Sequence, residues 1–185
     1  MLVAGNPTYG VSQGLYELYP DAVYCSRSSG YDLQSTQGRE QFAQMSTQHD
    51  VVLLVSTLGD FAQTMLLDAV YTECVEHNPG CHIVVVSSST DRVSKGMHWI
   101  YNTEKKSLKD LANSLGFIGD WETGPKISRI SFGAIEHKRH YHPTWNFIDI
   151  NSAATYIKWI IDQPKEFNIF ELGVEPMQNN EWWND

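Results

Sequence analysis

The amino-acid sequence predicts a doubly wound α/β fold, in which helices cover both faces of a parallel β-sheet. Short apolar runs alternate with longer segments whose apolar residues recur at helical spacing. The runs at 51–55 and 83–86 contain no polar residue, which is typical of strands buried on both faces. No internal repeat, low-complexity tract or linker divides the chain. We therefore expect a single three-layer α/β/α domain over residues 1–185.

Strands and helices alternate from the amino terminus onward. The first strand is stopped by Gly5-Asn6-Pro7 and the first helix by Pro20-Asp21. The triplet Tyr31-Asp32-Leu33 is long enough only for a very short strand, and the helix after it is indicated by few breakers and by the spacing of Phe42 and Met45. The elements expected in this half are a strand over 1–4, a helix over 11–19, strands over 22–26 and 31–33, and a helix over 36–48.

The second half of the chain continues the alternation. One helix carries its apolar residues at 61, 65, 66, 69 and 70, and a later helix is expected to run until Gly116. The elements expected in this half are strands over 51–56, 83–86, 127–132 and 167–174, and helices over 61–76, 99–115 and 152–161. A doubly wound sheet binds ligands at the carboxyl ends of its strands, so the functional residues are expected there.

Composition and charge exclude several classes of function. The 13 Lys and Arg residues are outnumbered by 22 Asp and Glu residues, which gives a formal net charge of −9. Such a chain lacks the basic surface that binds a nucleic-acid backbone or an anionic membrane. No apolar run approaches the roughly 18 residues of a membrane span, and no basic stretch precedes Gly5 as it would in a signal peptide. We expect a cytoplasmic protein with neither nucleic acid nor membrane as a partner.

The cysteine and histidine patterns predict neither a disulfide framework nor a metal site. Cys25, Cys74 and Cys81 are an odd number without a Cys-x-x-Cys pair. Three of the seven histidines lie in the segment 136–143, but no carboxylate or cysteine accompanies them at a recognisable ligand spacing. A loop that covers the substrate is the alternative interpretation of this segment.

A glycine-bearing turn joins the first strand to the first helix, over residues 5–14. Glycines let a ligand approach the backbone closely, and the free amides of a helix amino terminus attract phosphate. The pattern therefore predicts a pyrophosphate site in a Rossmann-type domain. A βα turn that simply requires glycine is the alternative.

The end of the second strand indicates which dinucleotide fits. An NAD-binding fold places a carboxylate there for the adenosine ribose. Here Ser26, Arg27 and Ser28 occupy the position, and no carboxylate precedes Asp32. Hydroxyls and a guanidinium suit a 2′-phosphate, so NADP fits better than NAD. A solvated arginine at a strand end is the alternative.

A serine, a tyrosine and a lysine follow the strand at 83–86. Tyr101 and Lys105 lie four residues apart, on one face of the predicted helix, where the ammonium is expected to lower the pKa of the phenol. Such a tyrosine can exchange a proton with an alcohol or carbonyl oxygen, and a serine at the strand end can hold the same oxygen. A Tyr-x-x-x-Lys on a solvated helix surface is the common alternative, but the serine-ended buried strand before it is much rarer.

At these residues the sequence resembles the short-chain dehydrogenase/reductase family, over nearly the whole chain. The glycine turn matches with one extra residue before Gly10, and a serine pair followed by Tyr-x-x-x-Lys matches Ser87-Ser88 and Tyr101/Lys105. The spacing makes Ser88 the better candidate of the pair. The resemblance implies that Tyr101 is the general acid/base, that Lys105 lowers its pKa and holds the nicotinamide ribose, and that Ser88 binds the substrate oxygen.

The resemblance also implies a set of cofactor-contacting positions. They are Gly5, Asn6, Thr8, Tyr9, Gly10 and Val11 in the turn; Ser26, Arg27, Ser28, Asp32 and Leu33 after the second strand; Ser56 and Thr57 after the strand at 51–56; Tyr101 and Lys105; and Phe132, Gly133 and Ile135 after the strand at 127–132. Family members commonly pair the helices at 61–76 and 99–115 across a two-fold axis, so a homodimer or homotetramer is expected.

Several positions depart from the family pattern. Residues 55–59 replace an Asn-Asn-Ala-Gly strand end, and Phe132 replaces a proline. The helix position that often holds an active-site asparagine falls near Thr64-Met65, and a methionine cannot relay a proton. Two functions remain open: an NADP-dependent oxidoreductase acting on a carbonyl or alcohol, and a non-catalytic NADP-binding sensor or interaction protein with the same fold.

Overall fold

The computed structural model describes residues 1–92, 100–118, 124–141 and 143–177. The strands are β1 (Leu2–Ala4), β2 (Val23–Cys25), β3 (Val51–Leu54), β4 (His82–Ser88), β5 (Lys126–Phe132) and β6 (Glu171–Val174). The helices are α1 (Val11–Leu18), α2 (Thr36–Ser46), α3 (Ala62–His77), α4 (Ile100–Ile118) and α5 (Ile150–Ile161), with single 3-10 turns η1 (Arg27–Ser29), η2 (Ser89–Arg92) and η3 (Glu136–Lys138).

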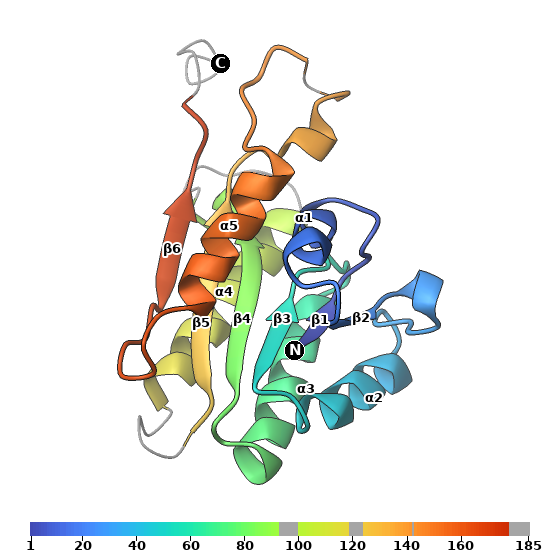
Figure 1. Ribbon diagram of the computed structural model, residues 1–185, viewed down its shortest axis with the longest axis vertical. Coiled ribbons are helices and arrows are strands. Elements are labelled where there is room, and N and C mark those ends of the chain that lie inside the picture. Colours follow the sequence, from blue (N-terminus) through green and yellow to red (C-terminus); the bar gives the residue numbers. More distant parts are fainter. Residues whose placement is uncertain (93–99, 119–123, 142, 178–185) are drawn as a thin grey trace.

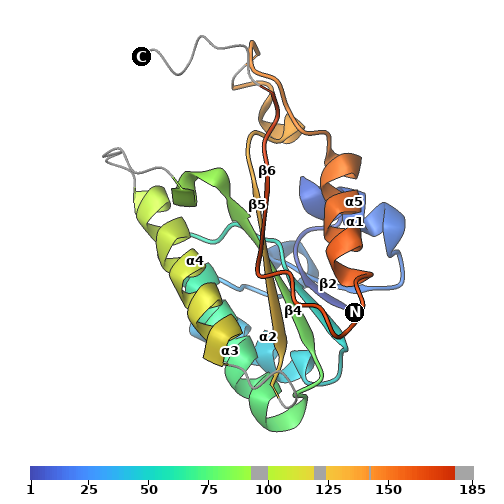
Figure 2. The same ribbon diagram turned by 90° about the vertical axis from the view of Figure 1, so that its left-hand side faces the viewer.

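The six strands form one parallel sheet in the order β2-β1-β3-β4-β5-β6 (Figure 1). Helices α1 and α5 cover one face, and α2, α3 and α4 cover the other (Figure 2). The expected three-layer, doubly wound α/β/α fold is therefore confirmed. Of the described helices, none is long and apolar enough to cross a membrane.

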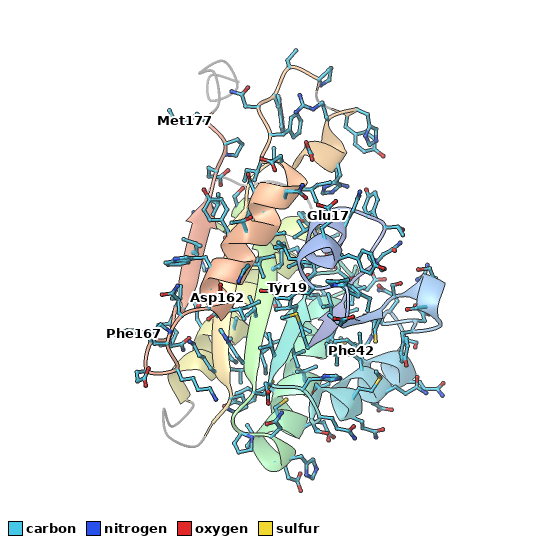
Figure 3. The ribbon with its side chains drawn as sticks, viewed as in Figure 1. Glu17, Tyr19, Phe42, Asp162, Phe167 and Met177 are labelled. Atoms are coloured by element: carbon cyan, nitrogen blue, oxygen red, sulfur yellow. The ribbon has the colours of Figure 1, made fainter. Side chains whose placement is uncertain are left out.

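Each face of the sheet buries its own apolar cluster. Leu2, Leu54 and Ile83 belong to the cluster beneath α2, α3 and α4, and Val3, Leu53 and Val84 belong to the one beneath α1 and α5. Alternate residues of the same strands thus enter opposite clusters, because side chains alternate across a strand. Phe42 and Tyr19, labelled in Figure 3, pack one in each cluster. Burial on both faces explains why the central strands are uninterrupted apolar runs.

The expected third strand at 31–33 is wrong. Ser26 and Ser29 exchange side-chain and backbone hydrogen bonds that close η1, and Gly30 takes a left-handed φ of 91°. Ser35 then caps α2 by accepting from the amide of Gly38 at 3.0 Å. Local polar bonds at both ends turn the chain where an extended strand was expected. Leu33 is buried in the core under α2.

Two further boundaries differ from expectation. Helix α4 continues past Gly116 to Ile118. The glycine does not end the helix; it makes room for a neighbour, because a Cβ at Gly116 would lie 3.2 Å from the Phe170 ring. Strand β6 begins only at Glu171, where pairing with β5 starts. Trp99, the expected first residue of the helix at 99–115, lies outside the described residues.

The topology fixes where a ligand is expected. β1 pairs with β2 on one side and with β3 on the other, so the chain direction across the sheet reverses at β1. The carboxyl ends of β1, β3, β4 and β5 meet at one edge beside this reversal. Open α/β sheets bind their ligands at such a point.

Candidate active site

A cavity of about 860 Å³ opens at the carboxyl ends of the central strands. It is lined by Asn6, Tyr9, Val11, Ser12, Val55, Ser56, Thr57, Leu58, Val86, Ser87, Ser88, Tyr101, Phe132, Gly133, Ala134, Ile135, His137, Lys138, Tyr141, Trp145 and Phe147. Ten of the residues singled out from the sequence line it: Asn6, Tyr9, Val11, Ser56, Thr57, Ser88, Tyr101, Phe132, Gly133 and Ile135. None of these lining residues is a carboxylate, although the chain carries a net charge of −9. The cavity therefore suits an anionic ligand.

The glycine turn forms one wall of this cavity. A Cβ at Gly5 would lie 2.1 Å from Ser12 Oγ, so only glycine lets β1 and α1 approach this closely. Gly10, with a left-handed φ of 58°, precedes α1, whose first turn has neither a side-chain cap nor an acidic residue. Its leading amides thus stay available to a ligand. The buried His137 Nδ1, which lacks a hydrogen-bond partner, would lie 3.7 Å from a Cβ at Gly10.

The remaining turn residues have local roles. Asn6 Oδ1 accepts hydrogen bonds from the amide and the hydroxyl of Thr8, at 3.1 and 2.9 Å. Tyr9 packs edge-on against His137, with ring centres 5.2 Å apart. This contact joins the glycine turn to the segment after β5. The geometry fits a dinucleotide phosphate held between the two.

The residues after β2 lie one strand away from the glycine turn. Ser26 Oγ and Ser28 Oγ are 2.8 Å apart, and Arg27 extends into solvent with its side chain 79% exposed. Arg27 Nη2 forms an ion pair with Asp32 Oδ1 at 3.2 Å. Asp32 therefore pairs with the guanidinium of Arg27, the group proposed to bind a 2′-phosphate.

Ser88 and Tyr101 meet in the cavity. Ser88 ends β4, and Tyr101 lies in the first turn of α4; both side chains line the cavity, and Ser88 is close enough to Tyr101 to lower the pKa of its phenol. Thr90, in η2, also donates its amide and its hydroxyl to Ser88 Oγ, at 3.4 and 3.2 Å. The two hydroxyl-bearing residues that were singled out by their spacing in the sequence thus lie in the same cavity.

The pKa of Tyr101 is raised above its ordinary value, contrary to the sequence-based expectation. Burial is the main cause, since it disfavours the charged tyrosinate, and the carboxylates of Asp91 and Glu104 act in the same direction. The hydroxyl of Ser88 opposes them. Tyr101 thus carries its proton at neutral pH, as a proton donor must.

Lys105 is buried and lies over the ring of Tyr101, with its ammonium bound to Gln63. Its Nζ donates to Gln63 Oε1 at 2.5 Å and lies 5.4 Å from the centre of the Tyr101 ring. Burial lowers the pKa of Lys105 to about 8, against the opposing effects of Glu104 and Asp91. Lys105 therefore sits behind the cavity wall, where its ammonium is held by an amide oxygen.

Gln63 is the polar residue of this region that the sequence did not reveal. Only 3% exposed, it donates from Nε2 to the carbonyls of Val86 at 2.9 Å and Leu54 at 3.3 Å. It thereby joins β3, β4 and Lys105. Met65, expected at the position of the family's asparagine, is instead 50% exposed. A helical-face count starting from the buried Leu66 and Leu67 would have placed Gln63 inside.

The start of α3 is held by α4. Asp60 and Phe61 both take left-handed φ angles, of 53° and 59°, which is costly for residues with a side chain. The Phe61 amide donates to the buried carboxylate of Glu104 at 3.1 Å. This bond fixes α3 against α4, so that Gln63 and Lys105 face each other.

The histidine-rich segment contributes to the cavity as a wall. His137, Lys138 and Tyr141 line it, and Lys138 Nζ lies 5.8 Å from the centre of the Tyr141 ring. Among the residues the structure describes, no group of three or more His, Cys, Asp or Glu side chains is placed to hold a metal ion. His142 lies outside the described residues. A second hollow, of about 660 Å³ between η1 and α2, contains neither Ser88 nor Tyr101.

Comparison with known proteins identifies the fold. No family model and no curated protein matches the sequence. Among solved structures, the chain is similar to a short-chain dehydrogenase/reductase from Vibrio parahaemolyticus, with 16% identity, a TM-score of 0.72, and coverage of 96% of this chain and 100% of that one. It is also similar to an alcohol dehydrogenase from the archaeon Thermococcus sibiricus complexed with 5-hydroxy-NADP, with 12% identity, a TM-score of 0.69 and coverage of 94% of each chain.

A third structure carries a cofactor as well. It is a short chain dehydrogenase from Burkholderia cenocepacia in complex with NADP, with 13% identity, a TM-score of 0.70, and coverage of 94% of this chain and 87% of that one. The fold of the present chain is that of the short-chain dehydrogenases and reductases.

Proposed function

We propose that this chain is an NADP-dependent oxidoreductase of the short-chain dehydrogenase/reductase type, acting on a carbonyl or alcohol carbon. The observation that carries the proposal is the Ser88–Tyr101 hydroxyl pair in a cavity whose other wall is the glycine turn. The fold alone supports the class weakly, since one fold hosts many functions. The juxtaposed hydroxyls and phosphate-type turn supply the chemistry that the fold does not.

NADP is the proposed cofactor, and the residues present fit it. The uncapped first turn of α1 offers its leading amides to a pyrophosphate, and Arg27 lies at the neighbouring strand end. The bound cofactor would supply or accept the hydride. Two of the similar structures are complexed with 5-hydroxy-NADP and with NADP, which is consistent with this choice.

The chain's own residues would handle the substrate oxygen and the proton. Ser88 would donate a hydrogen bond to the carbonyl oxygen, and Tyr101 would transfer its proton to that oxygen as it gains electron density. The raised pKa of Tyr101 favours this direction, because the phenol is protonated at neutral pH. Lys105, held by Gln63, would place a positive charge behind the tyrosine and balance the tyrosinate.

The test is a screen of NADPH oxidation against carbonyl compounds, repeated with Tyr101→Phe. This change removes one hydroxyl, so folding and NADPH binding should persist while turnover falls by roughly 10²–10⁴-fold, the usual contribution of a general acid/base. Lys105→Met should lower turnover as well, because it removes the positive charge that Gln63 holds behind Tyr101. Wild-type activity in Tyr101→Phe, on a substrate the protein demonstrably reduces, would refute the mechanism.

The second candidate function is a non-catalytic NADP-binding sensor or interaction protein. It is favoured by the position of Lys105, which contacts Gln63 rather than lining the cavity. Tight NADPH binding without turnover of any carbonyl compound would support it. In both cases we propose a cytoplasmic homodimer or homotetramer.

A further inference from the structure

A buried charged cluster lies directly behind the serine pair. Asp91 of η2 and Arg129 of β5 are 1% and 0% exposed, and Arg129 Nη1 lies 2.5 Å from Asp91 Oδ2. The same carboxylate oxygen accepts hydrogen bonds from Ser87 Oγ at 3.0 Å and from Ser131 Oγ at 2.8 Å. We call Asp91, Arg129, Ser87 and Ser131 the Asp91 cluster. A buried ion pair contributes little net stability compared with apolar residues, so its presence calls for another role.

The Asp91 cluster is built around the strand end that carries Ser88. Ser87 immediately precedes Ser88 on β4 and is paired in register with Ser131 on β5. Asp91 reaches both from η2, the turn in which Thr90 donates to Ser88 Oγ. Asp91 thus closes the turn back onto two strands at once, with Ser88 inside the closed turn.

We propose that Asp91 is a positioning residue of the active site, which holds Ser88 against Tyr101 by clamping η2 onto the ends of β4 and β5. The position of Ser88 Oγ is then set by bonds on both sides: Ser87 to Asp91 on one side and Thr90 to Ser88 on the other. Asp91 itself does not line the cavity. This inference rests on the proposed function of Ser88 and Tyr101.

The charges around Asp91 indicate why a carboxylate serves here. Arg129 is shared between Asp91 and Glu171 of β6, whose Oε2 lies 2.7 Å from Arg129 Nη2. Arg92 Nε lies 3.9 Å from Asp91 Oδ1 but also pairs with Glu175 at 3.0 Å, and Lys109 Nζ lies 3.5 Å from the Asp91 carbonyl. Part of the negative charge of Asp91 therefore still acts on α4, where, together with Glu104, it raises the pKa of Tyr101.

A purely structural cluster and a positioning cluster give different results in a matched pair of variants. Ser87→Ala and Ser131→Ala each remove one buried hydroxyl that donates to the same carboxylate oxygen. Ser131→Ala also removes an acceptor of Arg129 Nη1, so it disturbs the Asp91 cluster at least as much as Ser87→Ala does. Only Ser87 is on the strand that carries Ser88. The protein is labelled with tyrosine carrying ¹³C at Cζ, the carbon that bears the hydroxyl, and the Tyr101 resonance is assigned by its absence in Tyr101→Phe. This resonance reports the surroundings of the Tyr101 hydroxyl, including its approach to Ser88, without any substrate.

We expect Ser87→Ala to shift the Tyr101 resonance by more than its linewidth and to lower kcat for carbonyl reduction about five- to tenfold, with the KM for NADPH unchanged. Ser131→Ala should leave the resonance and kcat at their wild-type values. Equal effects of the two variants, or no shift in Ser87→Ala, would overturn the proposal.

Charge removal supplies a second test that does not depend on Ser87. Asp91→Asn alone leaves Arg129 buried without its main partner, and that variant can fail to fold. The double variant Asp91→Asn/Arg129→Met removes both charges, so we expect the Tyr101 resonance to shift. Because the Asp91 charge raises the pKa of Tyr101, we also expect the alkaline limb of the pH profile of kcat to move to lower pH. Glu171→Gln, which alters the same guanidinium from β6, is the control with an unchanged profile. An unchanged resonance in the double variant would overturn the proposal.

A wild-type protein without NADPH binding or turnover would refute the proposed function. The shifts of the Tyr101 resonance would still decide this inference.

Discussion

Replacing Asp32 by asparagine should raise the affinity for NADPH while leaving that for NADH unchanged. Arg27, proposed to hold the 2′-phosphate, forms an ion pair with Asp32 at 3.2 Å, and the two side chains are 79% and 53% exposed. A phosphate must displace this carboxylate before it can bind the guanidinium. An ion pair so exposed is worth about 0.2–1 kcal/mol. Relieving it should therefore tighten NADPH binding by a factor of about 1.4–5.

Arg27→Ala gives the opposite and larger effect. A charge-assisted contact contributes about 1.5–3 kcal/mol, but the broken Arg27–Asp32 pair returns up to about 1 kcal/mol. The net loss of about 0.5–2.8 kcal/mol corresponds to a factor of roughly 2–100 in the dissociation constant of NADPH. NADH lacks the 2′-phosphate, so its affinity should not change in either variant.

The assay is a fluorescence titration of each variant with NADPH and with NADH at fixed ionic strength. Asp21→Asn is the matched control, because it removes the same charge near the amino end of β2, away from the carboxyl ends of the strands where the cofactor is proposed to bind. The assignment of Arg27 fails if Arg27→Ala leaves the NADPH-to-NADH preference unchanged. The competition argument fails if Asp32→Asn tightens both nucleotides equally or neither.

Three further predictions follow from burial and exposure. Burial lowers the pKa of Lys105 to about 8 in the folded protein, so between pH 8 and 10.5 the unfolded chain binds more protons than the folded one. The free energy of unfolding, measured with urea, should therefore rise by about 2 kcal/mol from pH 7.5 to 9.5. Lys105→Met should not show this rise. Burial lowers the pKa of His82 to about 3, so the unfolded chain binds more protons than the folded one below neutral pH. The free energy of unfolding should therefore fall by about 2–3 kcal/mol from pH 7 to 4.5. His82→Gln places an amide beside Ser128 instead of the imidazole and should lose this dependence in the same measurement. If the proposed oligomer pairs α3 and α4, the exposed Met65 and Val75 of α3 lie at its interface. The double variant Met65→Glu/Val75→Glu should then shift the mass measured by light scattering toward the 21.0 kDa of one chain. An unchanged oligomer mass would exclude that interface.

The sequence predicted those parts of the fold in which pattern and burial agree. β3 and β4 are uninterrupted apolar runs because both of their faces are covered, and no other element fits such runs as well. The turn after β1 was recognisable because only glycine permits the close approach of Gly5 to Ser12. The residues 31–33 were predicted wrongly, because side-chain hydrogen bonds of Ser26 and Ser35 decide their path and no periodicity records them.

The site was predictable where its residues are close in sequence, and less so where they are distant. Ser88 and Tyr101 were found from their spacing, and they do meet. The helical spacing of Tyr101 and Lys105 gave the correct face of α4 but the wrong electrostatics, because burial outweighs a neighbouring charge. Gln63 and Asp91 escaped detection, since their partners Lys105 and Arg129 lie 42 and 38 residues away.

The two outermost strands limit how the sheet can interact with other chains. The longest strands, β4 and β5, are interior and have seven residues each, whereas the edge strands β2 and β6 have three and four. An edge strand exposes unpaired amide and carbonyl groups that can recruit a strand from another molecule, and a short edge offers few of them. Gly173 further weakens the strand character of β6. The short edge strands thus act against strand-to-strand aggregation, so contacts between copies of this chain would depend chiefly on the surfaces of its helices.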